Sequence, residues 1–401
     1  MYKPKVLVLT SSYPKFPGDV NGNFVFELAI RLKNDFEIFV IAPAYKDSLP
    51  FEISDGIRIY RHRQFLIKNV ELAYGIGIYE NLKGNKLKYF ILPFYFFFQL
   101  LLIRKLIKKE KINIVHAHWL IPNAFIAVIC RKIFKVDFKI ISTIHGSDFL
   151  GFNNRIGNFF KKIALNNIDL LTVVSNALKD KVSEFGYKSD IYVYSMGLDT
   201  NLFSPAKRDN SLKDKLGIKG PFLLFVGIIV EQKGIRYLIK SMPKVIEVFP
   251  DAKLVIVGEG NLKNEMIEFA DKLNVSNNLH FTGILPHDEL PQYFATADLF
   301  ILPSFSEGWP VVVMEALSSG TPTIVTNIPV FEKHEQKKRL FTIVPVGNSE
   351  FIAKEIIKML TKKKILLSPQ NDLRTYAKEN LDWVIISNKY KNIIRICIEK
   401  K

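Results

Sequence analysis

The segment Ala297–Thr326, ADLFILPSFSEGWPVVVMEALSSGTPTIVT, holds the pattern that decides the fold. A short apolar strand, Leu299–Leu302, is followed by a polar loop and then by an apolar helical stretch that ends at Gly320. A second short strand, Thr323–Val325, follows at once. Short apolar strands that alternate with helices are typical of a parallel sheet covered on both faces. The segment therefore predicts one strand–helix–strand unit of an α/β domain.

The same alternation runs through the rest of the chain and begins a second time near Phe222. The other predicted strands are Lys5–Thr10, Glu37–Ala42, Ile112–His116, Lys139–Ile144, Leu170–Val174, Ile191–Tyr194, Phe222–Val226, Leu254–Val257 and Thr342–Val344. The segment 199–221 is polar and contains Pro205 and Gly220, as an interdomain linker does. Because 401 residues suit two cores, we expect two Rossmann-like, doubly wound α/β domains facing a central cleft.

The net charge of +17 and the isoelectric point near 9.5 favour an anionic partner, which could be nucleic acid, anionic lipid or a phosphorylated substrate. The chain has no zinc-finger spacing, aromatic RNA-binding signature or arginine-rich arm, so we do not expect nucleic acid. The cysteines Cys130 and Cys397 show no metal-ligand or redox spacing, and no cleavable signal peptide follows the first residues. These features predict a cytoplasmic protein.

Two glutamates, Glu307 and Glu315, flank the predicted start of the helix in the opening segment. A helix that begins near Gly308–Pro310 would present unpaired main-chain amides, which suit an anion or a polyhydroxyl ligand. Pro310 fits a first helical turn because its missing N–H costs nothing there. The alternative is that Glu307 only caps the helix and that Glu315 is an ordinary helix residue.

In its context of strand, glycine and proline, this pair resembles the Glu-x7-Glu signature of retaining glycosyltransferases of family 4, also described as glycosyl transferases group 1. The resemblance implies the GT-B fold. It also implies that Glu307 contacts hydroxyls of the donor sugar and that Glu315 holds the ribose of the nucleotide. Main-chain amides of Gly308, Trp309 and Val311 would add hydrogen bonds to the sugar.

Phe225–Gly234, FVGIIVEQKG, resembles the strand, glycine and lysine turn with which this family receives the donor diphosphate. The resemblance makes Gly227 a donor-binding residue and Lys233 the cation that neutralises the leaving phosphate. The family commonly has an arginine directly after the first glycine, whereas this chain has Ile228. Gly258, after the next strand, resembles a residue beside the nucleotide base.

In the first half, Thr143–Asp148, TIHGSD, resembles the family's His-Gly-x-Asp loop, which places His145 beside the donor sugar. Asp148 is expected to stabilise that loop. Gly22, at the start of the first helix, is a further expected donor-side residue because glycine permits close approach. His116 and His118 have no third ligand in sight, so we predict no metal site.

The resemblance covers nearly the whole chain and sets the expected domain limits. The N-terminal, acceptor-side domain comprises residues 1–203 with a closing helix at 383–401, and the donor-binding domain comprises residues 204–382. The partners are then a nucleotide-diphosphate sugar and a glycan or lipid-linked glycan acceptor, with no further cofactor and no metal. A sugar-nucleotide epimerase of the same fold and a non-catalytic sugar-nucleotide-binding protein remain as alternatives.

The stretch Arg61–Lys111 carries eleven Lys or Arg against three Glu, and it contains the aromatic run Tyr89–Phe98, YFILPFYFFF. Tyr89–Ile103, which Pro93 and Gln99 interrupt, falls short of the ~20 residues that span a bilayer. Much of it should pack under the sheet, but it is apolar on nearly every side, while a helix on a sheet needs one buried stripe. We therefore expect a peripheral enzyme on the inner face of the cell membrane, with a freely soluble cytoplasmic enzyme as the alternative.

Overall fold

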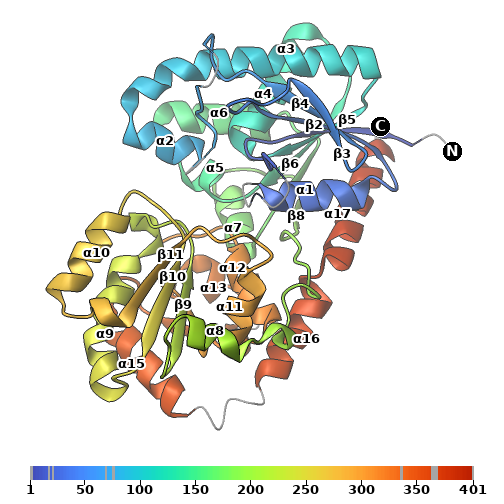
Figure 1. Cartoon of the computed structure of the whole chain (residues 1–401). Coiled ribbons are helices and arrows are strands. Elements are labelled where there is room, and N and C mark those ends of the chain that lie inside the picture. The colour runs from blue at the N-terminus through green and yellow to red at the C-terminus, as the bar shows by residue number, and fades with distance from the viewer. Residues whose placement is uncertain are drawn as a thin grey trace. The chain divides into compact units, whose positions relative to one another are not determined.

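The computed structural model describes residues 3–16, 19, 22–67, 70–74, 77–334, 337–362 and 369–399. The chain forms two compact units. The first unit combines Met1–Gly197 with Trp383–Lys401, and the second is Leu198–Asp382 (Figure 1). Each unit is built on its own sheet, so the prediction of two α/β domains is confirmed.

The first unit contains an eight-stranded sheet in the order β3-β4-β2-β1-β5-β6-β7-β8. Its strands are β1 (Lys5–Leu9), β2 (Glu37–Pro43), β3 (Phe51–Ser54), β4 (Ile57–His62), β5 (Ile114–His118), β6 (Lys139–Ile144), β7 (Leu170–Val173) and β8 (Ile191–Val193). All neighbours are parallel except β3, which runs antiparallel to β4 at the edge. The strands β5 and β7 are buried along their whole length, and β6 is buried after its first residue, as a doubly covered sheet requires.

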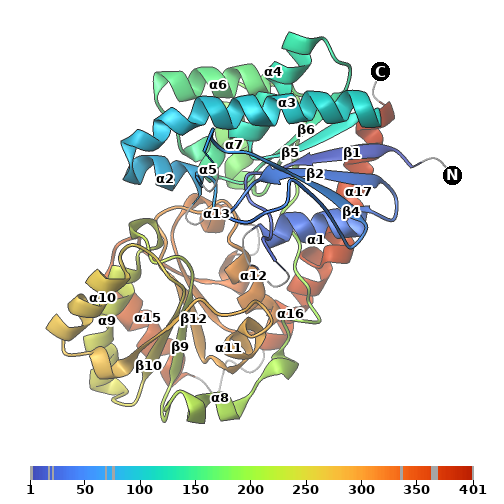
Figure 2. The same ribbon diagram turned by 45° about the horizontal axis from the view of Figure 1, so that its top comes forward.

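Helices cover both faces of this sheet. One layer contains α3 (Leu92–Glu110), α4 (Phe125–Phe134) and α6 (Arg155–Leu165), and the other contains α1 (Asn23–Leu32) and α17 (Trp383–Glu399) (Figure 2). The remaining helices of this unit are α2 (Ile78–Gly84), α5 (Ser147–Leu150) and α7 (Asn176–Glu184). The α17 helix is held by burial of Trp383 under Arg31, whose guanidinium carbon lies 5.1 Å from the indole ring, and by an ion pair of 2.9 Å between Lys391 and Asp35.

The second unit contains a six-stranded parallel sheet in the order β11-β10-β9-β12-β13-β14. Its strands are β9 (Phe222–Val226), β10 (Lys253–Val257), β11 (Leu279–Gly283), β12 (Leu299–Leu302), β13 (Thr323–Thr326) and β14 (Thr342–Val344). Its helices are α8 (Asn210–Lys215), α9 (Ile235–Val248), α10 (Lys263–Lys272), α11 (Leu290–Thr296), α12 (Val311–Ser318), α13 (Pro329–Glu332), α14 (Lys337–Leu340), α15 (Ser349–Thr361) and α16 (Pro369–Asn380).

Each sheet has one point at which the strand order reverses. In the first unit the chain leaves β1 toward β2 on one side and later continues from β5 on the other. In the second unit the same reversal separates β9 from β12. The loops that follow the two strands at a reversal diverge, and ligands of doubly wound sheets bind in the crevice between them. We therefore expect the candidate residues to lie near these two points.

The linker region belongs to the second unit. Leu198 donates its amide to the carbonyl of Leu381 at 2.9 Å, and the Thr200 hydroxyl donates to the Asp382 carboxylate at 2.5 Å. The Phe203 ring is buried 5.9 Å from that of Phe294. The unit boundary thus lies after Gly197, whereas the sequence prediction placed it after Phe203.

The predicted strands omitted the hairpin β3–β4 and the strand β11. The hairpin was readable, because FEISDGIRIY alternates in polarity around the dipeptide Asp55-Gly56, a strong hairpin signal. Both turn residues adopt the left-handed conformation that such a turn requires, with φ of 52° and 80°. The strand β11 carries His280 and Thr282 and is only half-buried, so its apolar run was weak.

The apolar run around Tyr89 is longer as a helix than the sequence suggested. A 3-10 turn, Lys86–Ile91, continues directly into α3, which gives 25 helical residues from Lys86 to Glu110. Within the described part of the chain, this is the one helix whose length and composition would allow it to cross a membrane. The prediction that the run is too short is therefore corrected: the charged ends of the helix were excluded from the count.

We predict that Arg374 on α16 stabilises the second unit by holding the linker. Its Nη1 donates to the carbonyls of Thr200, Phe203 (2.7 Å) and Ser318 (3.1 Å). Arg374→Met removes these hydrogen bonds, although the Phe203 carbonyl still accepts from the Ser318 hydroxyl at 2.6 Å. The variant should lower the free energy of unfolding by about 1–3 kcal/mol in urea titrations. Arg339→Met is the control, since its pair with Asp372 is more than half exposed on both sides and should contribute less than about 1 kcal/mol. Equal effects of the two variants would contradict the assignment.

Candidate active site

Lys233 and Glu307 meet at the reversal point of the second sheet. Lys233 ends a 3-10 turn after β9, Glu307 lies in the loop after β12, and Lys233 Nζ is 2.6 Å from Glu307 Oε1. The same carboxylate oxygen accepts a hydrogen bond of 2.7 Å from the Ser304 hydroxyl. The Glu307 side chain is 8% exposed and that of Lys233 is 20% exposed. This pair is a half-buried, preorganised cation and anion at the edge where ligands of such sheets bind.

Glu315 lies one turn inside α12 and is almost fully buried. The helix begins at Val311, with Pro310 as its N-cap, so Pro310 precedes the helix instead of forming its first turn as predicted. Glu315 is 3% exposed, and its Oε1 is 3.4 Å from His287 Nε2. Its other oxygen, Oε2, has no hydrogen-bond partner within the described residues. A buried carboxylate oxygen without a donor is costly, so a ligand hydroxyl at this point would be strongly favoured.

The glycines of the second unit are required mainly by close backbone packing. A Cβ at Gly258 would lie 2.0 Å from the carbonyl oxygen of Gly227, and one at Gly234 would lie 2.1 Å from that of Pro303. The amides of Gly227 and Gly258 donate to Val257 and Gly283 at 3.0 and 2.9 Å. Glycine at 258 and 234 therefore lets the loops at the sheet edge approach each other. Gly227 itself has room for a Cβ.

The loop Gly308–Pro310 leads into α12, and its only large side chain, Trp309, turns onto its own unit. The Trp309 ring stacks on His334 with centroids 5.2 Å apart and planes within 9°, and it also contacts Phe331 and Phe341. Any donor contact at Gly308, Trp309 or Val311 would thus use the main chain, as the resemblance implies. Ile228, where the family commonly has arginine, is 40% exposed.

In the first unit, His145 sits in an aromatic cluster at the carboxyl end of β6. Its Nε2 is 3.0 Å from Nδ1 of His118, and the two rings stack with centroids 5.2 Å apart. The rings of Trp119 and Phe24 lie 4.8 and 5.1 Å from His145. His116, deeper in β5, bonds the Thr143 hydroxyl at 2.8 Å. Three histidines from two neighbouring strands thus form one contiguous group.

This cluster is electrically neutral at physiological pH. Burial lowers the pKa of His116 and of His145 to about 3 and brings that of His118 well below its ordinary value, helped by the neighbouring imidazoles. One ring of the His118–His145 pair must then donate the proton of their shared hydrogen bond while the other accepts it. His145 can therefore offer a hydrogen bond to a ligand but not a positive charge.

Asp148 holds the loop that carries His145. Its Oδ1 accepts from the amides of His145 (3.1 Å) and Gly146 (2.9 Å), and its Oδ2 accepts from that of Leu120 (2.6 Å). Burial raises the pKa of this carboxyl to about 6, although the three amides oppose the shift. The side chain thus ties the ends of β5 and β6 together, which matches its expected role.

The local backbone explains why position 22 is a glycine. It is the N-cap of α1 with φ of 68°, and a Cβ there would lie 2.2 Å from the Ser12 carbonyl oxygen. The residue therefore lets the β1 loop fold against the start of α1, next to the reversal point of the first sheet. A donor contact of Gly22 stays a prediction.

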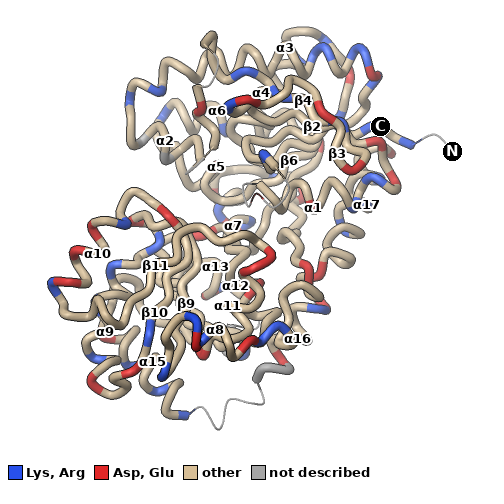
Figure 3. The backbone as a smooth tube through the Cα atoms, viewed as in Figure 1, with Lys and Arg blue, Asp and Glu red and all other residues tan. Residues whose placement is uncertain are grey.

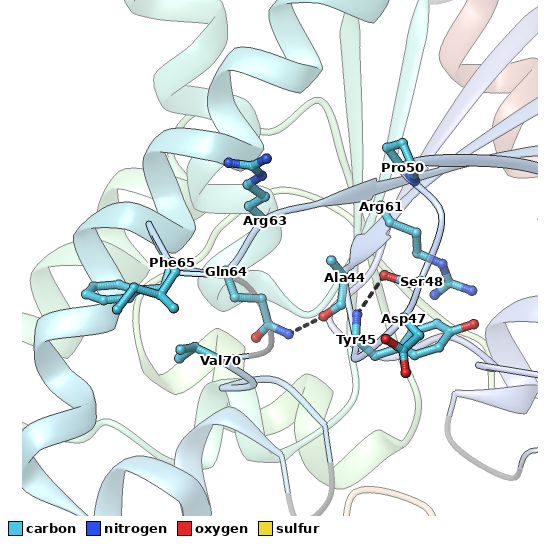
Figure 4. Close-up of a pocket in the computed structure, with 11 residues that line it drawn as sticks. Ala44, Tyr45, Asp47, Ser48, Pro50, Arg61, Arg63, Gln64, Phe65 and Val70 are labelled. Carbon is cyan, nitrogen blue, oxygen red and sulfur yellow. Dashed lines mark hydrogen bonds between the residues drawn. The ribbon is translucent and has the colours of Figure 1, made fainter.

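A pocket of about 330 Å³ opens in the first unit where β2 and β4 end (Figure 4). Tyr45, Ser48 and Gln64 line it with hydrogen-bonding groups, and Phe65 lines it with an apolar ring. Gln64 Nε2 donates to the Ala44 carbonyl at 2.6 Å, which fixes the amide at the wall. As for metals, the described residues contain no group of three or more His, Cys, Asp or Glu arranged to hold an ion.

Two functional candidates escaped the sequence analysis. The sequence presents His118 only as one half of a His-x-His pair, and it does not single out His287. The signal for His118 was its position at a strand end one strand away from His145. His287 follows Pro286 in an ordinary loop, and only the fold brings it to Glu315.

Two doubly wound parallel-sheet domains, with paired glutamates at the reversal point of the second, define a GT-B protein. Residues 22–202 match Glycosyltransferase Family 4 and residues 208–380 match Glycosyl transferases group 1, so the chain belongs to this family of glycosyltransferases.

Known proteins resemble the chain over most or much of its length. N-acetyl-alpha-D-glucosaminyl L-malate synthase of Bacillus anthracis is 24% identical over 71% of this chain and 75% of its own. The UDP-Gal:alpha-D-GlcNAc-diphosphoundecaprenol alpha-1,3-galactosyltransferase of Escherichia coli is 30% identical over 57% and 61%. Among solved structures, sucrose-phosphate synthase of Thermosynechococcus elongatus superposes with a TM-score of 0.82 at 16% identity and full coverage of both chains. HepE of Anabaena, in complex with UDP-glucose, has a TM-score of 0.74 at 16% identity, covering 98% and 99%.

The neutral histidines make the first unit sensitive to acid. An unfolded histidine protonates below about pH 6.5, whereas folded His116 and His145 do so only near pH 3. Between these values the unfolded state binds more protons, so stability falls as the pH falls, by up to about 2 kcal/mol for His116 at pH 5. Asp148, whose pKa is raised, opposes this but is a single group.

We therefore predict that the urea midpoint of the first unit falls from pH 7 to pH 5 by more than that of the second. A Trp309→Phe variant reports the first unit through Trp119 and Trp383, and a double Phe variant of those two reports the second. An unchanged first-unit midpoint would mean that these histidines protonate without cost in the folded state.

Proposed function

We propose that this glycosyltransferase moves a sugar from a nucleotide-diphosphate sugar to an acceptor hydroxyl with retention of the anomeric configuration. The acceptor is a glycan or lipid-linked glycan of cell-surface polysaccharide or glycoconjugate synthesis. The donor is held by the second unit, around Glu307, Glu315 and Lys233. The proposal includes a cytoplasmic location, in keeping with the two buried cysteines, Cys130 and Cys397.

The observation that carries the proposal is the buried carboxylate of Glu315 with its unpartnered Oε2. The two vicinal hydroxyls of a ribose can donate hydrogen bonds, so they would supply the donor that Glu315 Oε2 lacks. Four residues earlier the main chain enters α12, and eight residues earlier Glu307 pairs with Lys233. The carboxylates for the sugar hydroxyls and for the ribose thus lie along one loop and helix, and Lys233, the cation for the diphosphate, reaches the first of them from the turn after β9.

The proposed transfer needs no covalent enzyme intermediate. The bond from the anomeric carbon to the diphosphate oxygen breaks, and the acceptor oxygen bonds to the same face of that carbon. The acceptor proton moves to the departing phosphate oxygen. Lys233 stabilises the negative charge that grows on this oxygen, and no metal ion is assigned that task. Glu307 is tied to Lys233 and Ser304, which favours an orienting role over attack on the sugar.

Neutral His145 donates or accepts a hydrogen bond at a sugar hydroxyl, and His118 fixes which of these it does. The acceptor glycan is assigned to the first unit. The pocket lined by Tyr45, Ser48 and Phe65 supports this assignment because it offers hydroxyl groups beside an aromatic ring, as sugar sites require (Figure 4).

The named relatives support both substrates. The Escherichia coli relative is named for transfer of galactose from UDP-Gal to a diphosphoundecaprenol-linked sugar, and HepE was solved with UDP-glucose. The same relative motivates a lipid-linked acceptor here.

The test is release of nucleoside diphosphate from a panel of UDP-, GDP- and ADP-sugars, with and without candidate acceptors and with EDTA. We expect acceptor-dependent release that persists in EDTA, and a product whose anomeric configuration by NMR equals that of the donor. Conversion of the donor to an isomeric nucleotide sugar without acceptor would identify an epimerase. Tight donor binding without any turnover would identify a binding protein.

We predict that Glu315→Gln weakens donor binding ten- to a hundredfold, because hydrogen bonds to a charged group contribute about 1.5–3 kcal/mol. The same variant should keep or raise the urea midpoint, since it removes a buried charge that lacks one partner. Glu247→Gln, an exposed glutamate on α9, is the control for both measurements. A donor dissociation constant within twofold of wild type would place the ribose site elsewhere.

A further inference from the structure

The layer of α3, α4 and α6 leaves an unusual amount of apolar surface uncovered on the first unit. On α3 and the turn before it, Phe90, Phe97 and Leu101 are 74%, 54% and 39% exposed. Their spacing of seven and four residues places them on one face of the helix. Leu87, Ile133, Ile156 and Phe159 are each at least 60% exposed on the turn before α3, on α4 and on α6.

These three helices lie side by side (Figure 2). The ring of Phe96 on α3 is 6.3 Å from that of Phe125 on α4, which is 4.7 Å from that of Phe160 on α6. Near the other end of α3, the Arg104 guanidinium carbon lies 4.6 Å from the Phe134 ring of α4. The exposed residues therefore belong to one continuous outer layer, which we call the helical face.

The opposite side of α3 is committed to the core. Tyr95, Gln99 and Ile103 are fully buried, and Gln99 Nε2 donates to the Asn123 amide oxygen at 2.9 Å. The helix is long enough to cross a bilayer, but 28% of its most apolar window is buried inside the unit. Lipid could therefore contact only the side of the helix that faces away from the sheet. If the helix crossed the bilayer, Gln99 would lose Asn123 and enter hydrocarbon, and the apolar side of the sheet that the helix covers would be exposed to water. The helix can therefore lie on a membrane but not traverse it.

The charge of the helical face identifies its partner. Four basic residues lie on α3, two on α4 and three on α6, and the single acidic residue of these helices is Glu110. Of the basic side chains, Arg104, Lys105, Lys108, Lys109, Lys132, Arg155 and Lys162 are exposed. In Figure 3 the basic segments of α3 lie toward its carboxyl end. An apolar surface fringed by one sign of charge matches an interface of hydrocarbon below anionic headgroups.

Two other occupants fit less well. A second copy of the chain would bring like charges together across the contact, which costs several kcal/mol in protein interfaces. Nucleic acid would satisfy the basic residues, but Leu101, Ile133 and Ile156 gain nothing from a hydrated phosphate backbone. Lipid satisfies both halves of the surface at once.

We propose that the helical face docks on the headgroup region of an anionic lipid bilayer, with Phe90 and Phe97 inserted and the basic residues of α3, α4 and α6 on the lipid phosphates. The purpose of docking, which is to bring the enzyme to a lipid-linked acceptor, rests on the proposed function. Docking itself requires neither donor nor acceptor.

The test is co-sedimentation of the full chain with phosphatidylcholine vesicles, with or without phosphatidylglycerol. We expect binding that requires phosphatidylglycerol and weakens with salt. Each basic residue at the surface strengthens partition roughly fivefold, so Arg104→Glu/Lys105→Glu/Lys108→Glu should reduce it at least about a hundredfold. Phe90→Ser/Phe97→Ser should reduce binding at both low and high salt. Because all five positions are exposed, the fold should survive, which circular dichroism checks.

Matched controls lie on the second unit. Lys219→Glu/Lys240→Glu/Lys272→Glu makes the same change in net charge at exposed positions, and Phe351→Ser removes an exposed ring. Both should bind as wild type does. A Phe97→Trp variant should show a blue-shifted, bromolipid-quenched emission with vesicles, and Phe351→Trp should not.

Recovery of wild type in the supernatant with anionic vesicles at low salt would overturn the proposal. So would equal losses in the face and control variants, or a dimer in sedimentation velocity that the Phe90 and Phe97 substitutions dissolve. Preferential binding of the face to an RNA or DNA duplex over vesicles would assign it to nucleic acid instead. Nucleoside diphosphate release with a soluble acceptor should be unchanged in all face variants, so this test and that of the transfer fail separately.

Discussion

The parallel arrangement of the strands is the constraint on which the rest of the structure depends. A parallel pair needs a crossover helix, and right-handed crossovers send successive helices to one face of the sheet until the strand order reverses. In this chain the reversals fall between β1 and β5 and between β9 and β12. Lys233 and Glu307 follow these strands directly, and His145 follows the neighbouring strand β6.

Burial gives the polar residues at these edges their properties. Lys233 and Glu307 satisfy each other at 2.6 Å, so the cation is held ready without a ligand. Only one carboxylate oxygen of Glu315 has a hydrogen-bond partner, so the other oxygen favours binding of a ligand hydroxyl. The histidines of the first unit are kept neutral by the same desolvation, and Asp148 orders their loop through three amides. The candidate site of the second unit thus holds charged side chains, whereas the histidines of the first unit act through neutral hydrogen bonds.

The helical face shows how one helix can serve two purposes. A crossover helix on a sheet needs one apolar stripe, which α3 has in Tyr95, Ile103 and Leu106. Its second apolar stripe has no counterpart within the described residues of the unit and lies among exposed cations. Folding alone therefore explains one apolar side of α3, and the proposed docking on lipid would explain the other.

The sequence by itself determined the fold class and most of the elements. Runs such as Phe222–Val226 and Lys139–Ile144 were predicted with the observed bounds, because buried parallel strands are continuous apolar segments whose signal is local. The Asp55-Gly56 hairpin was also locally encoded, though it was not used. The motifs that resembled a known family located the loop with both glutamates and the lysine turn, since these too are short contiguous segments.

Tertiary structure alone decided which of these residues meet. The ion pair of Lys233 with Glu307 joins positions far apart in the chain, and the contacts of Glu315 with His287 and of His118 with His145 depend on the order of strands in the sheets. Burial was equally unreadable, because the same glutamate is a surface residue or a desolvated ligand according to what packs around it. Periodicity reports which side of a helix is apolar, and only the fold shows that α3 leaves one of its apolar sides open.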